Sequence, residues 1–127
     1  MDQLAERITD SELEVMHTLW DSPEDALPIS DIRRTLQARR GWESTTIKTL
    51  VTRLCAKGAV GQEKRRVFYY RALISEKEYN DWATGDLIRR LYRGKAKDLV
   101  AAILRTESLT AEDVDELRAM FRVEDDT

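Results

Sequence analysis

The stretch that decides the fold is WESTTIKTLVTRLCAKG, residues 42–58. If residues 45–57 form a helix, its large aliphatic side chains recur at i, i+3, i+4 and i+7 and make one apolar stripe: Ile47, Leu50, Val51 and Leu54. Ser44 precedes this helix as a suitable N-cap, and Gly58 follows it where a left-handed C-cap is expected. The pattern predicts an amphipathic helix that packs one face against a core.

The opposite face of this helix carries short hydroxyl side chains and cations: Thr45, Thr46, Lys48, Thr49, Thr52 and Arg53. Threonine is a poor helix former because its branched Cβ crowds the preceding turn, so these residues cost helix stability. Threonine can hydrogen-bond a base edge or touch a thymine methyl in the DNA major groove, and cations can contact phosphates. The face therefore indicates DNA recognition, and the alternative is an ordinary solvated helix surface.

Two helices are predicted before this stretch. Thr9 and Glu12 have the spacing of a capping box, and the helix that they begin is expected to extend to about Trp20. Ser30 is expected to cap a second helix, after which Gly41 turns the chain into residues 42–58. A short capped helix, a tight turn and a second amphipathic helix predict a helix-turn-helix.

After Gly58 the hydrophobic pattern becomes alternating, and residues 59–62 and 67–71 predict two short strands. The segment between them, residues 63–66, contains three consecutive cations. Such a tip is a solvated turn in most proteins, but directly after a helix-turn-helix it predicts a wing that reaches the phosphate backbone. The wing cations are Lys64, Arg65 and Arg66.

The charge of the chain is unevenly distributed. The whole sequence of 127 residues has a net charge of −3, which does not by itself indicate nucleic-acid binding. Residues 1–29 carry a net charge of −7, residues 30–72 carry +8 and residues 73–127 carry −4. A basic middle between acidic flanks is typical of a localised phosphate-binding surface.

Several classes of protein are not indicated by the sequence. No apolar run is long enough for a membrane span, and the N-terminus lacks the features of a signal peptide. The single cysteine, Cys55, cannot form an internal disulfide and is expected to pack as a small hydrophobe, which fits a cytoplasmic location. We find no nucleophile elbow, phosphate-binding glycine loop or metal-ligand cluster, so we expect no catalytic residues, metal or cofactor.

The C-terminal part, residues 74–127, predicts three helices and no strand. It has more large apolar side chains than one small chain can bury: Leu87, Leu91, Leu99, Ile103, Leu117 and Phe121. These side chains either cover the winged helix of their own chain or form the interface of a homodimer. The dimer is favoured because helix-turn-helix proteins commonly bind palindromic sites as two-fold dimers.

The fold class that follows is mainly α with a small β wing. Residues 1–73 are predicted to form a winged helix-turn-helix DNA-binding domain, and residues 74–127 a helical dimerisation region.

Two motifs resemble the penicillinase-repressor family, the BlaI/MecI/CopY type. They are ITDSELEVM followed by LW within residues 8–20, and TIKTLVTRL followed by KG within residues 46–58. The resemblance also includes YY at 69–70 and LYRG at 91–94. It implies a dimeric winged-helix repressor that binds dyad operators with TACA and TGTA half-sites. The thymine methyls of such sites suit Thr45, Thr46 and Thr49.

The resemblance also implies a way of release from DNA. Members of this family are inactivated by proteolysis in the dimerisation half, after a membrane metalloprotease receptor senses antibiotic. The cleaved bond, often Asn-Phe, aligns with Ala102-Ile103 in this sequence. The copper-responsive branch has a cysteine-rich C-terminus that this sequence lacks, so copper sensing is not expected.

Two functions of different classes are therefore compared. The first is a sequence-specific transcriptional repressor that controls beta-lactamase or other antibiotic-resistance genes, and the second is a winged-helix protein-interaction module. The cationic wing and the basic middle favour the first. Within the first class, the alternative is a regulator of an unrelated gene with a different release signal, because the target depends on the operator and not on the protein alone.

Overall fold

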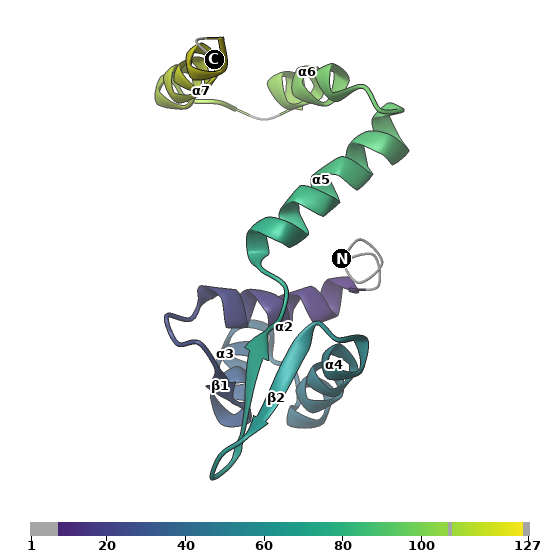
Figure 1. Ribbon diagram of the computed structural model, residues 1–127, viewed down its shortest axis with the longest axis vertical. Helices are drawn as coiled ribbons and strands as arrows, with labels where there is room; N and C mark the ends of the chain where they lie inside the picture. The colour runs from purple at the N-terminus through teal and green to yellow at the C-terminus, as the bar shows by residue number, and fades with distance from the viewer. Residues whose placement is uncertain (1–7, 107, 126–127) are drawn as a thin grey trace. The chain divides into compact units, whose positions relative to one another are not determined.

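A computed structural model of the chain describes residues 8–106 and 108–125, with side chains up to Arg122. The N-terminal stretch for which no signal peptide is expected lies outside these residues. The chain forms two compact units, Met1–Thr84 and Gly85–Thr127 (Figure 1). None of the described helices combines the length and the apolar character that crossing a membrane requires.

Unit 1 is a winged helix, as the sequence predicts. Its elements in chain order are α2 (Asp10–Asp21), β1 (Leu27–Pro28), α3 (Ile29–Arg40), α4 (Ser44–Lys57), β2 (Val60–Lys64), β3 (Phe68–Ala72) and the beginning of α5 (Glu76–Tyr92). The strands form an antiparallel sheet in the order β1-β3-β2. Figure 1 shows the β2–β3 hairpin extending beyond the helices as the wing.

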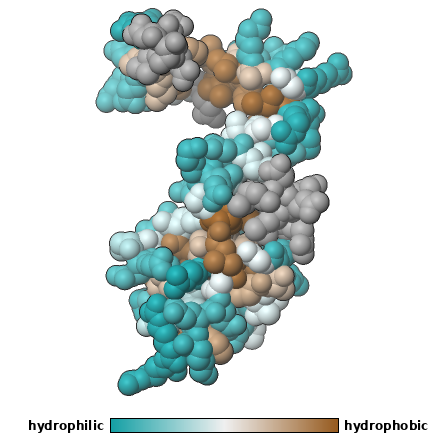
Figure 2. All heavy atoms as spheres, in the orientation of Figure 1, coloured by the Kyte–Doolittle hydropathy of each residue, from teal (hydrophilic) through white to brown (hydrophobic). Residues whose placement is uncertain are grey.

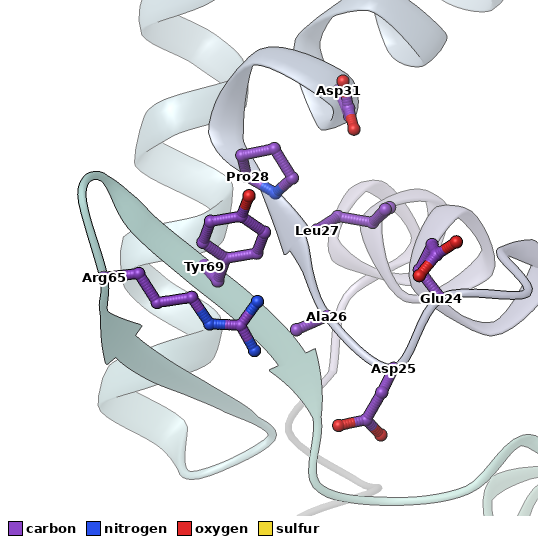
Figure 3. Close-up of a pocket in the computed structure, with 8 residues that line it drawn as sticks. All are labelled: Glu24, Asp25, Ala26, Leu27, Pro28, Asp31, Arg65 and Tyr69. Atoms are coloured by element: carbon purple, nitrogen blue, oxygen red, sulfur yellow. The ribbon is translucent and has the colours of Figure 1, made fainter.

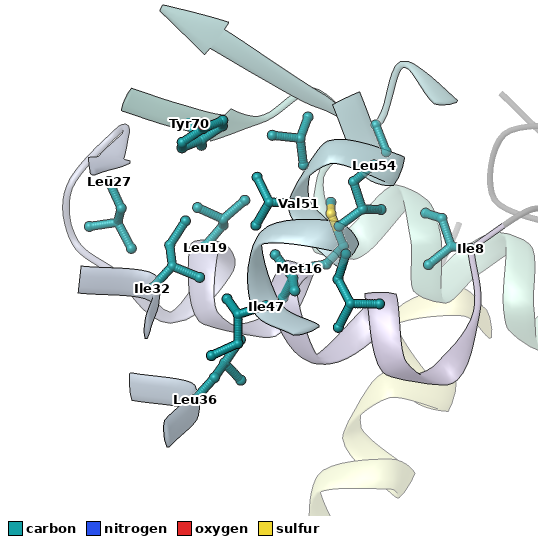
Figure 4. Close-up of a cluster of buried hydrophobic side chains, with 14 of the residues drawn as sticks. Ile8, Met16, Leu19, Leu27, Ile32, Leu36, Ile47, Val51, Leu54 and Tyr70 are labelled. Atoms are coloured by element: carbon teal, nitrogen blue, oxygen red, sulfur yellow. The ribbon is translucent and has the colours of Figure 1, made fainter. Parts of the chain in front are cut away.

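The core of unit 1 lies where the three helices meet the sheet (Figure 4). Every member of the predicted α4 stripe is buried there, together with Met16 of α2, Ile32 and Leu36 of α3 and Tyr70 of β3. Burying one such aliphatic side chain stabilises the fold by roughly 1.5–3 kcal/mol. Because the stripe of α4 is anchored to α2 and α3, its other face must point to solvent.

Two of the predicted helix caps are confirmed. The Glu12 backbone N–H donates to Thr9 Oγ1 at 3.2 Å, and the Thr9 N–H donates to Glu12 Oε1 at 2.9 Å, which completes the capping box of α2. Gly58 ends α4 with φ 84°, in the left-handed region that a residue with a Cβ adopts at a cost.

The predicted serine caps of the next two helices were wrong. α3 begins at Ile29, and Pro28 takes the capping position in an extended conformation (φ −71°, ψ 159°), still paired with Tyr69 in the sheet. Ser44 is already the first residue of α4, and its hydroxyl accepts a hydrogen bond from Gln37 Nε2 of α3 at 3.1 Å. This contact fixes the turn between the two helices.

The wing strands are shifted from their predicted positions. Lys64 pairs with Phe68 at the end of the ladder, so Lys64 lies on β2 and Val67 lies in the turn rather than on a strand. Tyr70 is buried, whereas Phe68, two residues earlier on the same face, is 40% exposed. The difference arises because this part of the hairpin extends past the helices and has no core to cover.

A buried ion pair joins the beginning of α2 to the end of α4. Lys57 Nζ lies 2.5 Å from Glu12 Oε1, and the Glu12 side chain is only 1% exposed. Burial by itself raises the pKa of Glu12, but hydrogen bonds from Lys57 and from the Thr9 backbone outweigh it and hold the pKa below its usual value. Glu12 therefore both caps α2 and neutralises a cation of the basic region.

The boundary between the two units lies within α5. The Trp20 indole donates to the Ile74 carbonyl at 2.9 Å, and Tyr79 and Trp82 pack against the core of unit 1. The first turns of α5 therefore pack with unit 1, which extends to Thr84.

Unit 2 consists of the end of α5, α6 (Ala96–Thr106) and α7 (Ala111–Asp125). Arg93 and Gly94, with φ of 54° and 83°, end α5. Thr110 caps the beginning of α7, since its hydroxyl accepts from the Asp113 N–H at 3.0 Å. Among the described residues of unit 2, no side chain is buried, so this unit has no core of its own.

The Glu12–Lys57 pair leads to a prediction about stability. Lys57→Met leaves the Glu12 carboxylate buried without its cation, and we expect the free energy of unfolding at pH 7 to fall by about 3 kcal/mol. Because the Glu12 pKa is lowered on folding, the pair stabilises the protein above the unfolded pKa of about 4.3 and loses this effect as pH falls through the folded pKa. Urea unfolding across pH should show the gap between wild type and variant narrowing in acid.

Lys48→Met is the matched control, because Lys48 lies on the same helix, is exposed and makes no ion pair within the described residues. It should change the free energy of unfolding by no more than about 0.5 kcal/mol. Equal losses for the two variants, or a gap that does not depend on pH, would contradict the role of the pair.

Candidate nucleic-acid interface

The outward face of α4 presents all six side chains that the sequence places there. Each of them is exposed: Thr45, Thr46, Lys48, Thr49, Thr52 and Arg53. The Thr49 hydroxyl donates to the Thr45 carbonyl of its own helix at 2.9 Å, so it remains an acceptor for an external donor. Such a face can offer hydroxyl groups, methyl groups and two cations to a ligand at the same time.

Several contacts within the turn between α3 and α4 fix its conformation. Gly41 ends α3 with φ 68°, and its N–H donates to the Gln37 carbonyl at 3.0 Å. The Arg40 guanidinium lies over the Trp42 ring, 5.7 Å from its centroid. Together with the Gln37–Ser44 hydrogen bond, these contacts set the position of the N-terminal end of α4.

The three wing cations are not equivalent. Arg65 is paired with Glu63 at 2.9 Å and lies over Tyr69, 4.2 Å from the ring centroid. Lys64 lies over the Phe68 ring at 4.7 Å and makes no ion pair within the described residues. Arg66, at the turn, is exposed and likewise has no carboxylate partner in the described chain. The hydrogen bond from Arg65 also lowers the pKa of Glu63.

Intramolecular ion pairs reduce the effective charge of the basic middle. Six of its cations already face a carboxylate: Arg34, Arg39, Arg40, Lys57, Arg65 and Arg71. The cations without an ion pair in the described chain are Arg33, Lys48, Arg53, Lys64 and Arg66. Four of these five belong to α4 or the wing, so the charge that can bind an external anion is concentrated on the two predicted DNA-contacting elements. The predicted site did not include Arg33.

A cavity that the sequence did not indicate lies beside the wing (Figure 3). Its volume is about 440 Å³, and its lining is Glu24, Asp25, Ala26, Leu27, Pro28, Asp31, Arg65 and Tyr69. In Figure 3 the Arg65 side chain extends from the wing toward the loop that carries Asp25. Three carboxylates against one guanidinium make this cavity unsuitable for a phosphate.

Among the described residues, no group of three or more His, Cys, Asp or Glu side chains could hold a metal ion.

Cys55 lies on the flank of the α4 stripe and is half-buried. Burial raises the pKa of its thiol above the ordinary value. Since the thiolate is the reactive form, this environment is that of a packing residue and not of a reactive cysteine.

Four of the six predicted interface residues of unit 2 are exposed. Leu91, Ile103, Leu117 and Phe121 are exposed, and Leu87 and Leu99 are half-buried. Further exposed apolar side chains lie on α6 and α7: Val100, Leu104 and Met120. Figure 2 shows hydrophobic surface over α6, whereas the tip of the wing in unit 1 is hydrophilic. An apolar surface of this kind is typical of an interaction site.

The predicted cleavage bond lies inside α6. Ala102 is half-buried, Ile103 is 38% exposed, and the Ala102 carbonyl accepts a hydrogen bond from the Thr106 hydroxyl at 2.7 Å. A protease that requires an extended substrate must therefore unwind this helix locally.

Comparison with known proteins adds independent information. The chain is 30% identical over 119 residues to a methicillin resistance regulatory protein, MecI, of Mammaliicoccus sciuri, a match that covers 93% of this chain and 95% of that protein. It is 31% identical over 112 residues to a penicillinase repressor of Bacillus licheniformis, covering 87% of this chain and 86% of that protein.

A solved structure is similar to part of the chain. It is the solution structure of the Bacillus licheniformis BlaI monomeric form in complex with the blaP half-operator, with a TM-score of 0.51 and 35% sequence identity. The match covers 57% of this chain and 88% of that one. The family model described as penicillinase repressor matches residues 8–122, nearly the entire chain. The chain therefore belongs to the penicillinase repressor family.

Proposed function

We propose that the protein is a transcriptional repressor that binds a two-fold symmetric DNA operator as a homodimer. The observation that carries the proposal is the outward face of α4. Because the apolar stripe of this helix is buried, its threonines and two cations are exposed, and the two cations have no ion pair in the described chain. Lys64 and Arg66 of the wing extend the same cationic surface. The relationship to a BlaI structure with a bound half-operator supports DNA as the ligand, and argues against a protein-interaction module.

In this proposal the two elements have different tasks. The α4 face enters the major groove, where Thr45, Thr46 and Thr49 contact base edges and thymine methyls. Lys48, Thr52, Arg53 and the wing cations contact phosphates and fix the register of the protein on the duplex. Sequence preference then depends on α4, and most of the salt dependence depends on the cations.

The dimer is proposed from the surface of unit 2. Exposed apolar side chains on α5, α6 and α7 would be covered in a symmetric interface with a second copy of the chain. Two winged helices held in this way would read two half-sites about one helical turn apart, roughly 34–36 Å.

The proposed target is a beta-lactamase gene or another antibiotic-resistance gene, because the relatives are named as penicillinase and methicillin resistance regulators.

Release from DNA is proposed to occur by proteolysis at Ala102-Ile103, by a membrane metalloprotease sensor. The described residues of α6 include no buried side chain, so local unwinding of this helix costs little core packing. Cleavage would separate α7 from the rest of the interface and remove the gain in affinity that comes from linking two half-sites.

The first prediction separates base recognition from phosphate binding. Thr46→Ala and Thr49→Ala should each weaken binding to the preferred site, selected from a random duplex library, by about 1–3 kcal/mol more than binding to random DNA. Replacing Lys64, Arg65 and Arg66 together by Ala should weaken both duplexes alike and reduce the log–log salt slope by about 0.9 for each phosphate that is no longer bound. Fluorescence anisotropy titrations at several salt concentrations measure both effects.

Thr84→Ala is the control for the threonine variants, because Thr84 is a helical threonine of α5 outside the proposed interface. It should leave both affinities unchanged. If the α4 variants showed equally reduced affinity for selected and random DNA, the threonines would position the protein and would not read bases.

A second prediction concerns the dimer. Phe121 is 67% exposed, so Phe121→Glu should not unfold unit 2, but it should place a charge in the proposed interface. The dimer would bury Phe121 in both subunits, so the loss of this aromatic side chain from each subunit is expected to raise the dimer dissociation constant by roughly a hundredfold or more. Ala119→Glu introduces the same charge at another exposed position of α7 and serves as the control. Sedimentation that finds the wild-type chain monomeric at micromolar concentration would disprove the dimer.

A third prediction concerns release from DNA. In cells exposed to a beta-lactam, mass spectrometry of the protein should detect a fragment that ends at Ala102, while unexposed cells retain the intact chain. Expression of the repressed gene should rise with the amount of this fragment. Full derepression with every molecule intact would contradict proteolysis and indicate a bound effector instead.

A further inference from the structure

Arg33 of α3 is a cation for which the described chain supplies no counter-charge. Its side chain is half-buried, and its Nε atom is shielded from solvent without a hydrogen-bond partner. None of the ion pairs within the described residues involves it. A buried donor on a charged group that stays unpaired is costly, so it calls for a specific explanation, and a bound ion is one such explanation.

The other arginines of α3 are satisfied within the protein. Arg34, the next residue, lies 2.8 Å from Asp31, and Arg40 lies 2.7 Å from Glu14. Arg39 is 4.0 Å from the same glutamate. Carboxylates are therefore available around this helix, and Arg33 is the arginine of α3 that pairs with none of them within the described residues.

The position of Arg33 follows from two contacts on either side of it. Pro28, immediately before α3, pairs with Tyr69 of the wing strand β3, and Gln37 donates to Ser44 at the start of α4. Ile29, Arg33 and Gln37 are spaced by four residues and lie along one flank of the helix. Arg33 therefore lies between the wing strand and the N-terminal end of α4, the two elements proposed to contact DNA.

We infer that Arg33 is a phosphate-binding residue, and that a backbone phosphate of the bound duplex is its missing counter-charge. A planar guanidinium can hold two phosphate oxygens at once, which suits a donor whose orientation is fixed by partial burial. The inference rests on the proposed DNA-binding function. It adds a contact from α3 between those of α4 and the wing, so that three elements of unit 1 bind the backbone.

The competing explanation is purely structural, because the aliphatic stem of an arginine can cover apolar surface while its charge stays in water. Arg33→Met separates the two, since it keeps an apolar stem and removes the charge. Arg34→Met is the matched control: it removes the same charge from the adjacent position, where the side chain is 75% exposed and paired with Asp31. Arg33→Lys restores the charge.

The test is a salt titration of the full-length protein with a duplex of random sequence, which requires no knowledge of the operator. Arg33→Met should reduce the magnitude of the log–log salt slope by about 0.9, so that the ratio of wild-type to variant affinity grows roughly eightfold for each tenfold decrease in salt. Arg34→Met and Arg33→Lys should keep the wild-type slope. Thermal unfolding shows whether Arg33→Met is folded at the assay temperature, and Arg33→Gln replaces it if it is not.

The outcomes distinguish this inference from the function on which it rests. If the wild-type protein binds with a steep salt dependence and Arg33→Met has the same slope, Arg33 is a packing residue and the DNA-binding proposal stands. Equal reductions for Arg33→Met and Arg34→Met would also overturn the inference, because the effect would then reflect net charge alone. If the wild-type protein does not bind duplex DNA at all, both the inference and the proposed function are wrong.

Discussion

The packing of the apolar stripe of α4 against α2 and α3 is the interaction on which the rest of the structure depends. Ile47, Leu50, Val51 and Leu54 are buried in the common core, and this burial compensates for the poor helix propensity of the threonines on the other side. One helix can therefore be tightly anchored and still present an exposed surface of hydroxyl groups and cations. The β2–β3 wing, which follows α4 closely in the chain, takes its position from the same core through Val60 and Tyr70.

Electrostatic pairing within unit 1 determines which cations can bind an external anion. Glu12, Glu14, Asp25, Asp31 and Glu63 each pair with a cation of the basic middle. The positive charge that is left over belongs to α3, α4 and the wing. A chain with a net charge of −3 can in this way carry a local cationic surface, because folding places its carboxylates selectively. The same logic distinguishes Arg33 from its neighbour Arg34.

Unit 2 is organised by a different physical constraint. Its helices are short and amphipathic, and among its described residues none is buried, so most of their apolar side chains remain at the surface. Helices of this length are marginal in water without tertiary packing. Association with a second chain would supply the packing that they lack. Stability of this unit would then depend on protein concentration, and a cut within α6 would affect assembly more than the fold of unit 1.

The sequence alone determined the elements and their faces, because capping boxes, glycine C-caps and helical spacing are local signals. It predicted the winged helix, the outward residues of α4 and the exposed apolar side chains of unit 2 from such patterns. Only the tertiary structure decided which charges are paired, since Lys57 and Glu12 are far apart in the sequence and meet only across the core. It also showed that the first turns of α5 pack with unit 1, through Tyr79 and Trp82. The distinct environment of Arg33 and the cavity beside the wing are likewise products of packing, because each depends on contacts between elements that no local pattern encodes.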